Sequence, residues 1–235
     1  MPRAAKIAVH VPPRRNESPS MIRTVVFDFE GTLVDFQWQL GPAQLELRRA
    51  FAVQGHAVSG SYAQMWNAAA DEAVAAGRLH ALRAALGPVY DRWDADALAR
   101  WSPRPGAAAL LARLAARGVA AAMVSNVGRS ALVAALERFA LQRGLAPVLS
   151  RDDVVHLKPH PEGVRAVLAM RGCATGQALF VGDSLADVAA ARAAGVRVAI
   201  VRGGECDDAA VAAAGPDHFV SALDEVDALL DVAGG

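Results

Sequence analysis

The chain has 235 residues with 24 basic and 24 acidic side chains, so its formal net charge at neutral pH is zero. Hydrophobic residues make up 54% of the sequence. This excludes a disordered or collagen-like chain and is enough for one domain with an insertion or for two small domains. A neutral chain lacks the basic excess of a dedicated nucleic-acid-binding protein. The two cysteines, Cys173 and Cys206, allow at most one disulfide, so nothing requires an oxidising compartment.

The first 20 residues are rich in Pro and Arg and have no hydrophobic segment of secretory length. We expect residues 1–20 to be a disordered leader, with Met21 directly before the first strand. No stretch approaches the ~20 uninterrupted apolar residues of a membrane span. The expected protein is therefore cytoplasmic, with no nucleic-acid or membrane partner, and its oligomeric state is not predicted.

The choice of basic residue is uneven along the chain. Arginine supplies 22 of the 24 basic side chains, and only Lys6 and Lys158 depart from this. A compact ammonium and a planar guanidinium are not interchangeable beside a reactive group. The single lysine inside the folded region is therefore a candidate functional residue.

From Met21 onward, short β-branched runs alternate with alanine- and leucine-rich helical segments. Strands are predicted at Ile22–Phe27, Val119–Val124, Pro147–Leu149, Ala178–Val181, Val196–Val201 and His218–Val220. Helices are predicted at 106–117, 128–140, 161–171, 184–194, 207–214 and 222–232. Strands that alternate with helices of this length predict an α/β fold with a parallel sheet covered by helices on both faces.

The alternation stops between the first and second predicted strands. This segment contains no convincing strand, holds all four tryptophans and both tyrosines, and has three helical stretches, at about 41–54, 60–76 and 91–101. We expect an all-helical insertion whose aromatic residues form its own small core. The predicted domains are a Rossmann-like core of residues 21–35 and 103–235 and a helical cap domain of residues 36–102.

Ligands of an open parallel sheet bind at the carboxyl ends of its strands. In this chain those ends and the following loops carry Asp28, Glu30, Ser125, Asn126, Lys158, Asp183 and Asp187. Carboxylate oxygens are suitable ligands for Mg²⁺, and Lys and Ser donors are suitable for phosphate oxygens. The pattern therefore predicts a site for a divalent cation and a phosphate.

Four segments in chain order resemble the motifs of the haloacid-dehalogenase-like superfamily. They are DFEGTLVD from Asp28, SN at Ser125, KPHPEG from Lys158 and GDSLADVAAARAAG from Gly182. The resemblance runs from about residue 22 to 201 and is greatest to phosphoglycolate-phosphatase-like phosphatases with a helical cap between the first two motifs. It implies a Mg²⁺-dependent phosphatase acting on small phosphate monoesters, phosphoglycolate-like or sugar-phosphate-like, through an aspartyl-phosphate.

The resemblance also implies roles for individual residues. Asp28 would be the nucleophile and would bind Mg²⁺ together with Asp183 and the main-chain carbonyl of Glu30. Asp187 would orient metal-bound waters, since positions i and i+4 share a helix face. Helix capping is the alternative role for Asp183.

The remaining motif residues would bind the phosphate. Ser125 and the amide of Asn126 would hold its oxygens, and Lys158 would bridge the nucleophile and the phosphate. Helix capping is the alternative role for Ser125.

Glu30 departs from the family pattern, because related phosphatases usually carry Asp at this second acidic position. There the acid protonates the leaving oxygen and then activates water. The additional methylene of Glu moves the carboxyl by roughly 1 Å, and misplacement on that scale can cost about 10²-fold in rate. We expect Glu30 to act as the general acid and base, and the alternative is a site that binds but turns over poorly.

Three alternative functions remain open at this stage. A phosphomutase of the same superfamily would use the same phospho-enzyme, and a catalytically weak phosphate- or metal-binding regulatory protein would follow from a defective Glu30. Dehalogenase chemistry is disfavoured by the acidic residue at position 30.

Other candidates are given non-catalytic interpretations. His156 and His160 are expected to be surface residues, and zinc is not predicted because no Cys/His cluster has ligand spacing. Gly203-Gly204 is expected to be a turn. The substrate and the cap residues that select it are not predicted.

Overall fold

A computed structural model of the chain describes residues 21–231. The predicted leader of residues 1–20 lies outside this range, as do residues 232–235. All strands of the described chain join one parallel sheet of six strands in the order β3-β2-β1-β4-β5-β6. The strands are β1 (Thr24–Phe27), β2 (Ala120–Val124), β3 (Leu145–Leu149), β4 (Ala178–Gly182), β5 (Arg197–Val201) and β6 (His218–Val220).

β1 lies in the middle of the sheet and is buried along its whole length. Thr24 pairs with Ala120 of β2 on one side and with Ala178 of β4 on the other. Successive side chains of a strand point to opposite faces. Val25 therefore packs in one hydrophobic core and Val26 in a second one. Because both faces of the strand are buried, its sequence does not alternate between apolar and polar residues.

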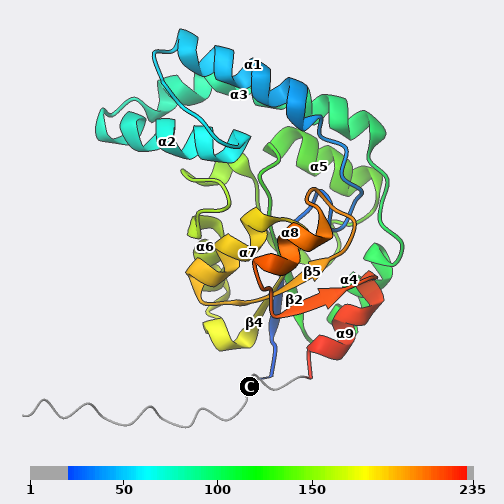
Figure 1. Cartoon of the computed structure of the whole chain (residues 1–235). Helices are drawn as coiled ribbons and strands as arrows, with labels where there is room; N and C mark the ends of the chain where they lie inside the picture. Colours follow the sequence, from blue (N-terminus) through cyan, green and yellow to red (C-terminus); the bar gives the residue numbers. More distant parts are fainter. Residues whose placement is uncertain (1–20, 232–235) are drawn as a thin grey trace, which may run out of the picture.

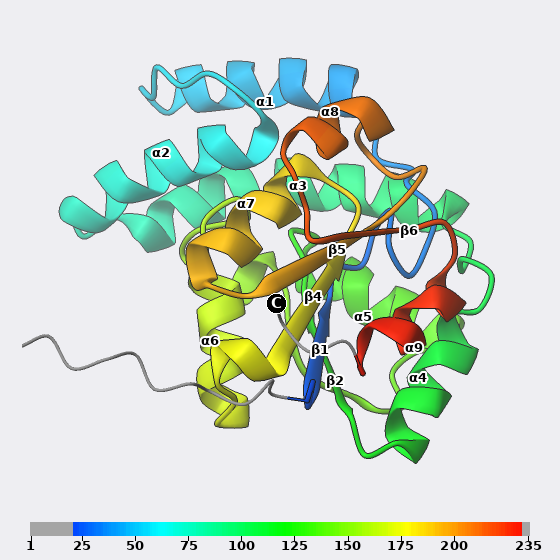
Figure 2. The same cartoon turned by 60° about the horizontal axis from the view of Figure 1, so that its bottom comes forward.

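Helices cover both faces of the sheet, so the predicted α/β fold class is confirmed (Figures 1 and 2). One face packs on α4 (Ala107–Ala116), α5 (Arg129–Arg138) and α9 (Val226–Leu229). The other face packs on α6 (Glu162–Arg171), α7 (Leu185–Ala194) and α8 (Asp208–Ala213). In the part of the chain that the structure describes, no helix is long and apolar enough to cross a membrane.

Four helices follow β1 before the chain enters β2, and the first three occupy the segment for which helices are predicted. These three are α1 (Leu40–Val53), α2 (Tyr62–Ala75) and α3 (Leu79–Arg100), and they lie together at one end of the molecule (Figure 1). α3 is longer than the predicted 91–101 because it continues through Pro88. A proline inside a helix removes one hydrogen bond and costs about 3 kcal/mol. Leu86 and Tyr90, both fully buried on either side of it, supply packing that offsets this cost.

The aromatic residues of the insertion form a packed cluster. The ring centroid of Trp38 lies 4.7 Å from that of Tyr62 and 6.5 Å from that of Tyr90, and Trp66 contacts Tyr90 edge-on at 5.7 Å. Trp101 crosses to the core and meets Phe29 edge-on at 5.1 Å. The expected aromatic packing is present, but it is not a separate core: these residues belong to one buried cluster with residues of the sheet, such as Val25 and Phe27.

Two other element predictions are corrected in their bounds. β3 begins at Leu145 and contains Pro147; this proline is tolerated because β3 is an edge strand that pairs only with β2. The predicted helix 222–232 is a 3₁₀ turn, η3 (Leu223–Glu225), followed by the short α9. The Glu225 carboxylate accepts hydrogen bonds from the amides of Ser221 and Ala222, which stabilises that tight turn.

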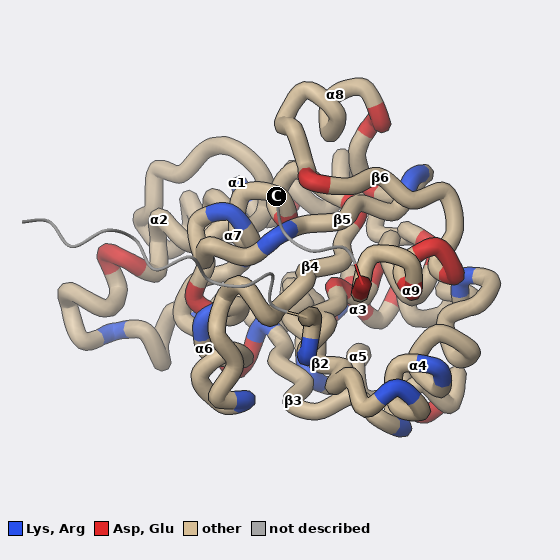
Figure 3. The backbone as a smooth tube through the Cα atoms, turned by 90° about the horizontal axis from the view of Figure 1, so that it is seen from below, with Lys and Arg blue, Asp and Glu red and all other residues tan. Residues whose placement is uncertain are grey.

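Charged residues of both signs are interspersed over the described chain (Figure 3). On α4 and α9 they meet as ion pairs, in which Arg113 contacts Asp227 and Arg117 lies 2.6 Å from Asp231. Basic and acidic residues are thus mixed along the described elements and are not segregated onto separate ones.

A buried ion pair joins the inserted helices to the core. Arg151 lies in the 3₁₀ turn η1 (Arg151–Asp153) after β3, and its side chain is 3% exposed, as is that of Asp94 on α3. Arg151 Nη1 donates to Asp94 at 2.7 Å and Nη2 donates to Asp91 at 2.5 Å. Asp94 also accepts from the Trp38 indole and from the amide of Gly128. The planar fork of Arg suits this two-carboxylate contact.

We predict that Arg151→Met lowers the free energy of unfolding by about 3–5 kcal/mol, because it leaves Asp94 buried without its cation. Urea denaturation followed by circular dichroism measures the change. Arg129→Met is the matched control. The Arg129 side chain, which pairs with Asp153, is 53% exposed, so its loss should cost less than about 1 kcal/mol. Equal losses in the two variants would contradict this account.

Candidate active site

The carboxyl ends of the central strands bring the predicted residues together. Asp28 follows β1, Ser125 follows β2 and Asp183 follows β4, and all three are buried. The side-chain oxygens of Asp28, Asp183 and Asp187 lie within 4.8 Å of one another. The parallel arrangement of the strands thus converts residues more than 150 positions apart into one acidic cluster.

Lys158 inserts its ammonium between two members of this cluster. Its Nζ lies 2.5 Å from Asp28 Oδ1 and 2.7 Å from Asp187 Oδ1, and the side chain is 4% exposed. Burial alone would lower the pKa of Lys158, but the carboxylates of Asp187 and Asp28 outweigh it and raise this pKa. The lysine is therefore a fixed positive charge beside Asp28.

Asp187 organises the turn between β4 and α7. Its Oδ2 accepts hydrogen bonds from the amide of Asp183 at 3.1 Å and from the amide and hydroxyl of Ser184 at 3.0 and 2.7 Å. Ser184 is the N-cap of α7 and forms a capping box with Asp187. Asp183 is therefore not the cap of this helix, and its side chain is available to the acidic cluster.

Two glycines, Gly31 and Gly204, pack closely against the Asp183 carboxylate. A Cβ added to Gly31 would lie 2.0 Å from Asp183 Oδ2, and one added to Gly204 would lie 2.1 Å from the same oxygen. Thr32 Oγ1 and the amide of Glu205 donate to this carboxylate. The predicted Gly203-Gly204 turn thus contributes to the site through its second glycine.

The charges of the cluster do not balance. Three buried carboxylates face one ammonium, and burial raises the pKa of Asp28 to about 6 in spite of Lys158. Burial and the charges of Asp187 and Asp28 raise the pKa of Asp183 well above its usual range. A divalent cation would neutralise the surplus negative charge, and carboxylate oxygens are suitable ligands for one. The residues present therefore fit a bound cation.

The end of β2 holds the lysine loop in place. Asn126 accepts from the amide of Lys158 at 3.0 Å and donates to the carbonyl of Lys158 at 3.1 Å, which clamps the lysine backbone on both sides. The hydroxyl of Ser125 accepts from the amide of Val127 at 3.1 Å. The N-cap of α5 is Gly128, so neither residue caps that helix. The clamp formed by the Asn126 side chain is a role that its motif alone does not reveal.

Glu30 is directed towards the two linkers that lead into and out of the insertion. Its Oε1 accepts from the amides of Gln37 and Trp38 at 2.8 and 2.7 Å and from the Trp101 indole at 2.8 Å. Within residues 21–231 no hydrogen bond to Oε2 is present. Burial raises the pKa of Glu30 to about 8, although the three donors favour the carboxylate. Oε1 is thus occupied as an acceptor, and Oε2 is the oxygen that can take a proton without loss of these hydrogen bonds.

Sequence analysis did not identify Glu205. This residue follows Gly204 in the loop after β5, and its side chain lines the same pocket as Asp28, Glu30 and Lys158. Burial and the charges of Asp187 and Asp28 raise its pKa to about 7. Glu205 follows a glycine pair in the loop after β5, and this position near the carboxyl end of a strand is the sequence feature that indicates a site residue.

The pocket combines strand-end residues with the inserted helices. Aromatic side chains of the insertion and its linker line it opposite Asp28, namely Phe36, Trp38, Tyr62 and Tyr90. Two arginines of α3 are engaged elsewhere and do not line this pocket: Arg83 donates to the carbonyl of Val154 at 2.7 Å, and Arg92 pairs with Glu46.

Comparisons with known proteins agree with this architecture. Residues 22–195 match the family of haloacid dehalogenase-like hydrolases. A plasmid-encoded phosphoglycolate phosphatase of Cupriavidus necator is 38% identical over 126 residues, about half of either chain (54%). A phosphoglycolate phosphatase of Rhodospirillum rubrum is 35% identical over 195 residues, which cover 77% of this chain and 80% of that protein.

A solved structure of a hydrolase from Pseudomonas syringae has the same fold. Its TM-score is 0.65 at 20% identity, with 90% of this chain and 99% of that chain covered. The chain therefore belongs to the haloacid dehalogenase-like hydrolase family. The predicted enzyme class, a phosphatase of this family, is confirmed by the same matches.

We predict that Gly204→Ala lowers kcat/KM for small phosphate monoesters by about 10²-fold, because the new methyl group must displace Asp183 by about 1 Å or more. Gly203→Ala is the control: its φ is +72°, and an added Cβ meets no heavy atom of the described chain within 4 Å. It should cost about 1–2 kcal/mol in stability with little loss of turnover. Kinetics and thermal unfolding of both variants test the contrast, and full activity of Gly204→Ala would contradict it.

Proposed function

We propose that the enzyme hydrolyses small phosphate monoesters through a phosphorylated Asp28, with Mg²⁺ bound at the acidic cluster. The observation that supports this most directly is the position of Lys158, whose ammonium lies 2.5 Å from Asp28 and 2.7 Å from Asp187. A carboxylate can attack an anionic phosphate only where positive charge offsets the repulsion. The buried ammonium supplies part of that charge.

Asp28, Asp183 and the main-chain carbonyl of Glu30 would hold the Mg²⁺. The ion would neutralise negative charge on the transferring phosphoryl oxygens. Asp187 would orient metal-bound water, as the resemblance implies. Its contacts with Lys158 and Ser184 add a second proposed role, which is to position the ammonium.

Asp28 would attack phosphorus with a carboxylate oxygen while the bond from phosphorus to the ester oxygen breaks. The proton on Glu30 Oε2 would pass to the leaving oxygen. Water would then attack the aspartyl-phosphate, the Glu30 carboxylate would take the proton of that water, and phosphate would leave from a regenerated Asp28. Glu30 is suited to the first step because its raised pKa keeps it protonated at neutral pH.

Ser125 and the amide of Asn126 would bind the remaining phosphate oxygens. Both residues line the pocket together with Lys158. The side chain of Asn126 clamps the lysine backbone, so its main-chain amide is the group available for phosphate. These assignments give the phosphate donors from the end of β2 and from the loop after β3.

The insertion would act as a cap domain, residues 36–102, over a core of residues 21–35 and 103–235. Aromatic residues at 36, 38, 62 and 90 narrow the pocket, which supports a small substrate. The relatives named phosphoglycolate phosphatase support a phosphoglycolate-like or sugar-phosphate-like ester. Closure of the cap would exclude bulk water from the phospho-enzyme.

One observation keeps a weakly catalytic binding protein as a second candidate. Three hydrogen bonds hold Glu30 Oε1 at the linkers, and a carboxyl fixed there could be too far from the leaving oxygen. The phosphomutase alternative has no comparable support. The cytoplasmic location and the lack of nucleic-acid or membrane partners stay predictions.

We predict that Asp28→Asn lowers turnover by at least about 10³-fold, because the amide is a poor nucleophile. The measurement is release of phosphate from a panel of small phosphate monoesters, with and without Mg²⁺. Acid-quenched wild-type enzyme should carry labelled phosphate and the variant should not. Asp224→Asn, a change at an exposed position of η3, is the control with normal activity. Full turnover by Asp28→Asn would refute the mechanism.

We predict a bell-shaped pH profile of kcat/KM between about pH 6 and about pH 8. Activity should fall below the first value as the Asp28 nucleophile becomes protonated, and above the second as Glu30 loses the proton it donates. Bound Mg²⁺ should move the lower limb further down. Glu30→Gln keeps an acceptor oxygen for the three donors but cannot titrate.

This variant should lose the alkaline limb and about 10²–10⁴-fold in turnover. Glu30→Asp is the matched comparison that retains a titrating acid and therefore an alkaline limb. An unchanged alkaline limb in Glu30→Gln would assign that limb to another group.

A further inference from the structure

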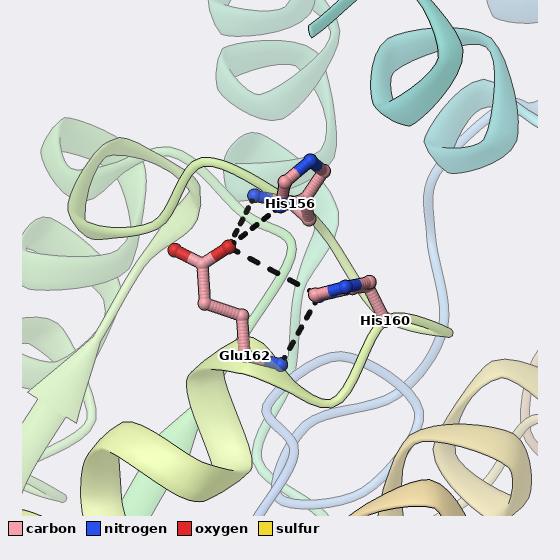
Figure 4. Close-up of side chains that lie close together, drawn as sticks. All are labelled: His156, His160 and Glu162. Atoms are coloured by element: carbon pink, nitrogen blue, oxygen red, sulfur yellow. Dashed lines mark hydrogen bonds and ion pairs between the residues drawn. The ribbon is translucent and has the colours of Figure 1, made fainter. Parts of the chain in front are cut away.

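Two histidines and a glutamate gather outside the pocket, where the loop after η1 enters α6 (Figure 4). His156 and His160 lie in the loop, and Glu162 is the first residue of α6. Each contributes one nitrogen or oxygen atom, and these three atoms lie within 4.8 Å of one another. His156, expected to be a surface residue, is half-buried, with 20% of its side chain exposed.

The separations suit a small coordination sphere. Glu162 Oε2 lies 2.8 Å from His156 Nδ1 and 4.0 Å from His160 Nδ1. Two ligands of a tetrahedral ion with bonds of about 2.0–2.1 Å are about 3.3 Å apart. The first distance is shorter and the second longer than that value, so His160 has to move towards Glu162 for all three ligands to reach one ion.

Asp71 of α2 fixes the orientation of the His156 ring. His156 Nε2 lies 2.8 Å from Asp71 Oδ1, so Nδ1 is the nitrogen that faces Glu162 and His160. A histidine that binds a metal usually donates its other ring N–H to a carboxylate, which sets the tautomer and raises the basicity of the ligand. The inserted helix α2 thus supplies the second hydrogen bond that such a histidine requires.

The other two ligands are also oriented by neighbouring backbone. The Glu162 carboxylate accepts from the amides of Val155 and His156 at 2.7 and 3.0 Å. The amide of Glu162 donates to His160 Nδ1 at 3.3 Å, so that nitrogen carries the lone pair and Nε2 carries the proton. A metal would take this lone pair in place of the Glu162 amide, whose hydrogen bond to Nδ1 would break.

Without a metal, the surroundings of His156 favour its protonated form. Both of its ring nitrogens lie 2.8 Å from carboxylate oxygens, which accept hydrogen bonds and cannot donate them when ionised. Burial alone would lower the pKa of His156, but its hydrogen bonds to Glu162 and Asp71 raise it. A divalent ion would displace the Nδ1 proton and take over the neutralisation of the two carboxylates.

We propose that His156, His160 and Glu162 form a second metal site, separate from the acidic cluster, which takes a transition-metal ion such as Zn²⁺ or Co²⁺. Two imidazole nitrogens and one carboxylate favour these ions over Mg²⁺, which prefers oxygen ligands. Partial exposure of the three side chains gives the ion access and leaves a position for water. The site does not depend on the proposed phosphatase mechanism.

Calorimetric titration of Zn²⁺ into the full-length protein in excess Mg²⁺ tests the site, with histidine-ring NMR signals recorded in parallel. Wild type and Asp183→Asn should each bind one Zn²⁺ per chain outside the acidic cluster. The ring signals of His156 and His160 should shift, and about one proton should be released per ion, as the buffer dependence of the heat will show.

His160→Ala should bind Zn²⁺ at least about 10-fold more weakly, and Asp71→Asn should lose about 10- to 100-fold through misorientation of His156. The His160 side chain is 44% exposed, so its removal should leave the fold intact. His56→Ala is the matched control, because His56 also pairs with a glutamate, Glu72 at 2.7 Å, and should bind Zn²⁺ like wild type.

Two results would overturn the proposal. Zn²⁺ binding that survives in His160→Ala but disappears in Asp183→Asn would place the ion in the acidic cluster only. A wild-type protein that binds no Zn²⁺ would show that the three side chains form an ion-pair network alone. Failure of the proposed phosphatase mechanism would instead change kinetics and leave the titration unchanged.

Discussion

The contact of Lys158 with Asp28 and Asp187 is the interaction on which the site depends. It joins the end of β1, the loop after β3 and the first turn of α7 through one ammonium. Removal of buried charges from water is costly unless they are paired and hydrogen-bonded. The clamp of Asn126 on the lysine backbone and the turn held by Asp187 keep that pairing in place. Asp28, the lysine loop and the acidic cluster therefore meet at this contact.

The chain uses its two kinds of basic residue for different geometries. Arg151 is buried between Asp91 and Asp94, where a planar fork can donate to two carboxylates at once. Lys158 is buried where two carboxylates converge on one point, and a compact ammonium fits there. In a sequence that uses arginine almost everywhere, the internal lysine therefore marks a position where only a point charge fits.

Glu30 connects the proposed chemistry to the inserted helices. One of its oxygens accepts hydrogen bonds from both linkers of the insertion, through Trp38 and Trp101 among others. Any movement of these linkers would move the carboxyl that is proposed to protonate the leaving group. The Glu30 side chain reaches donors at residues 37, 38 and 101, so the residue that departs from the family pattern has partners in both linkers. The position of the acid and the position of the insertion are thus coupled by direct contacts.

Sequence alone determined the order and type of most elements and the residues of the acidic cluster, because both follow from local patterns. A continuous apolar run indicates a doubly buried strand, and a carboxylate after it lies at the ligand-binding edge of a parallel sheet. The continuation of α3 through Pro88 was decided by packing around Leu86 and Tyr90. The roles of Glu205 and of the Asn126 side chain, the donors to Glu30 and the meeting of His156 with Asp71 also required tertiary structure. Each of these contacts joins residues that are distant in the chain and depends on how deeply they are buried. A local sequence pattern encodes neither the distant partner nor the burial.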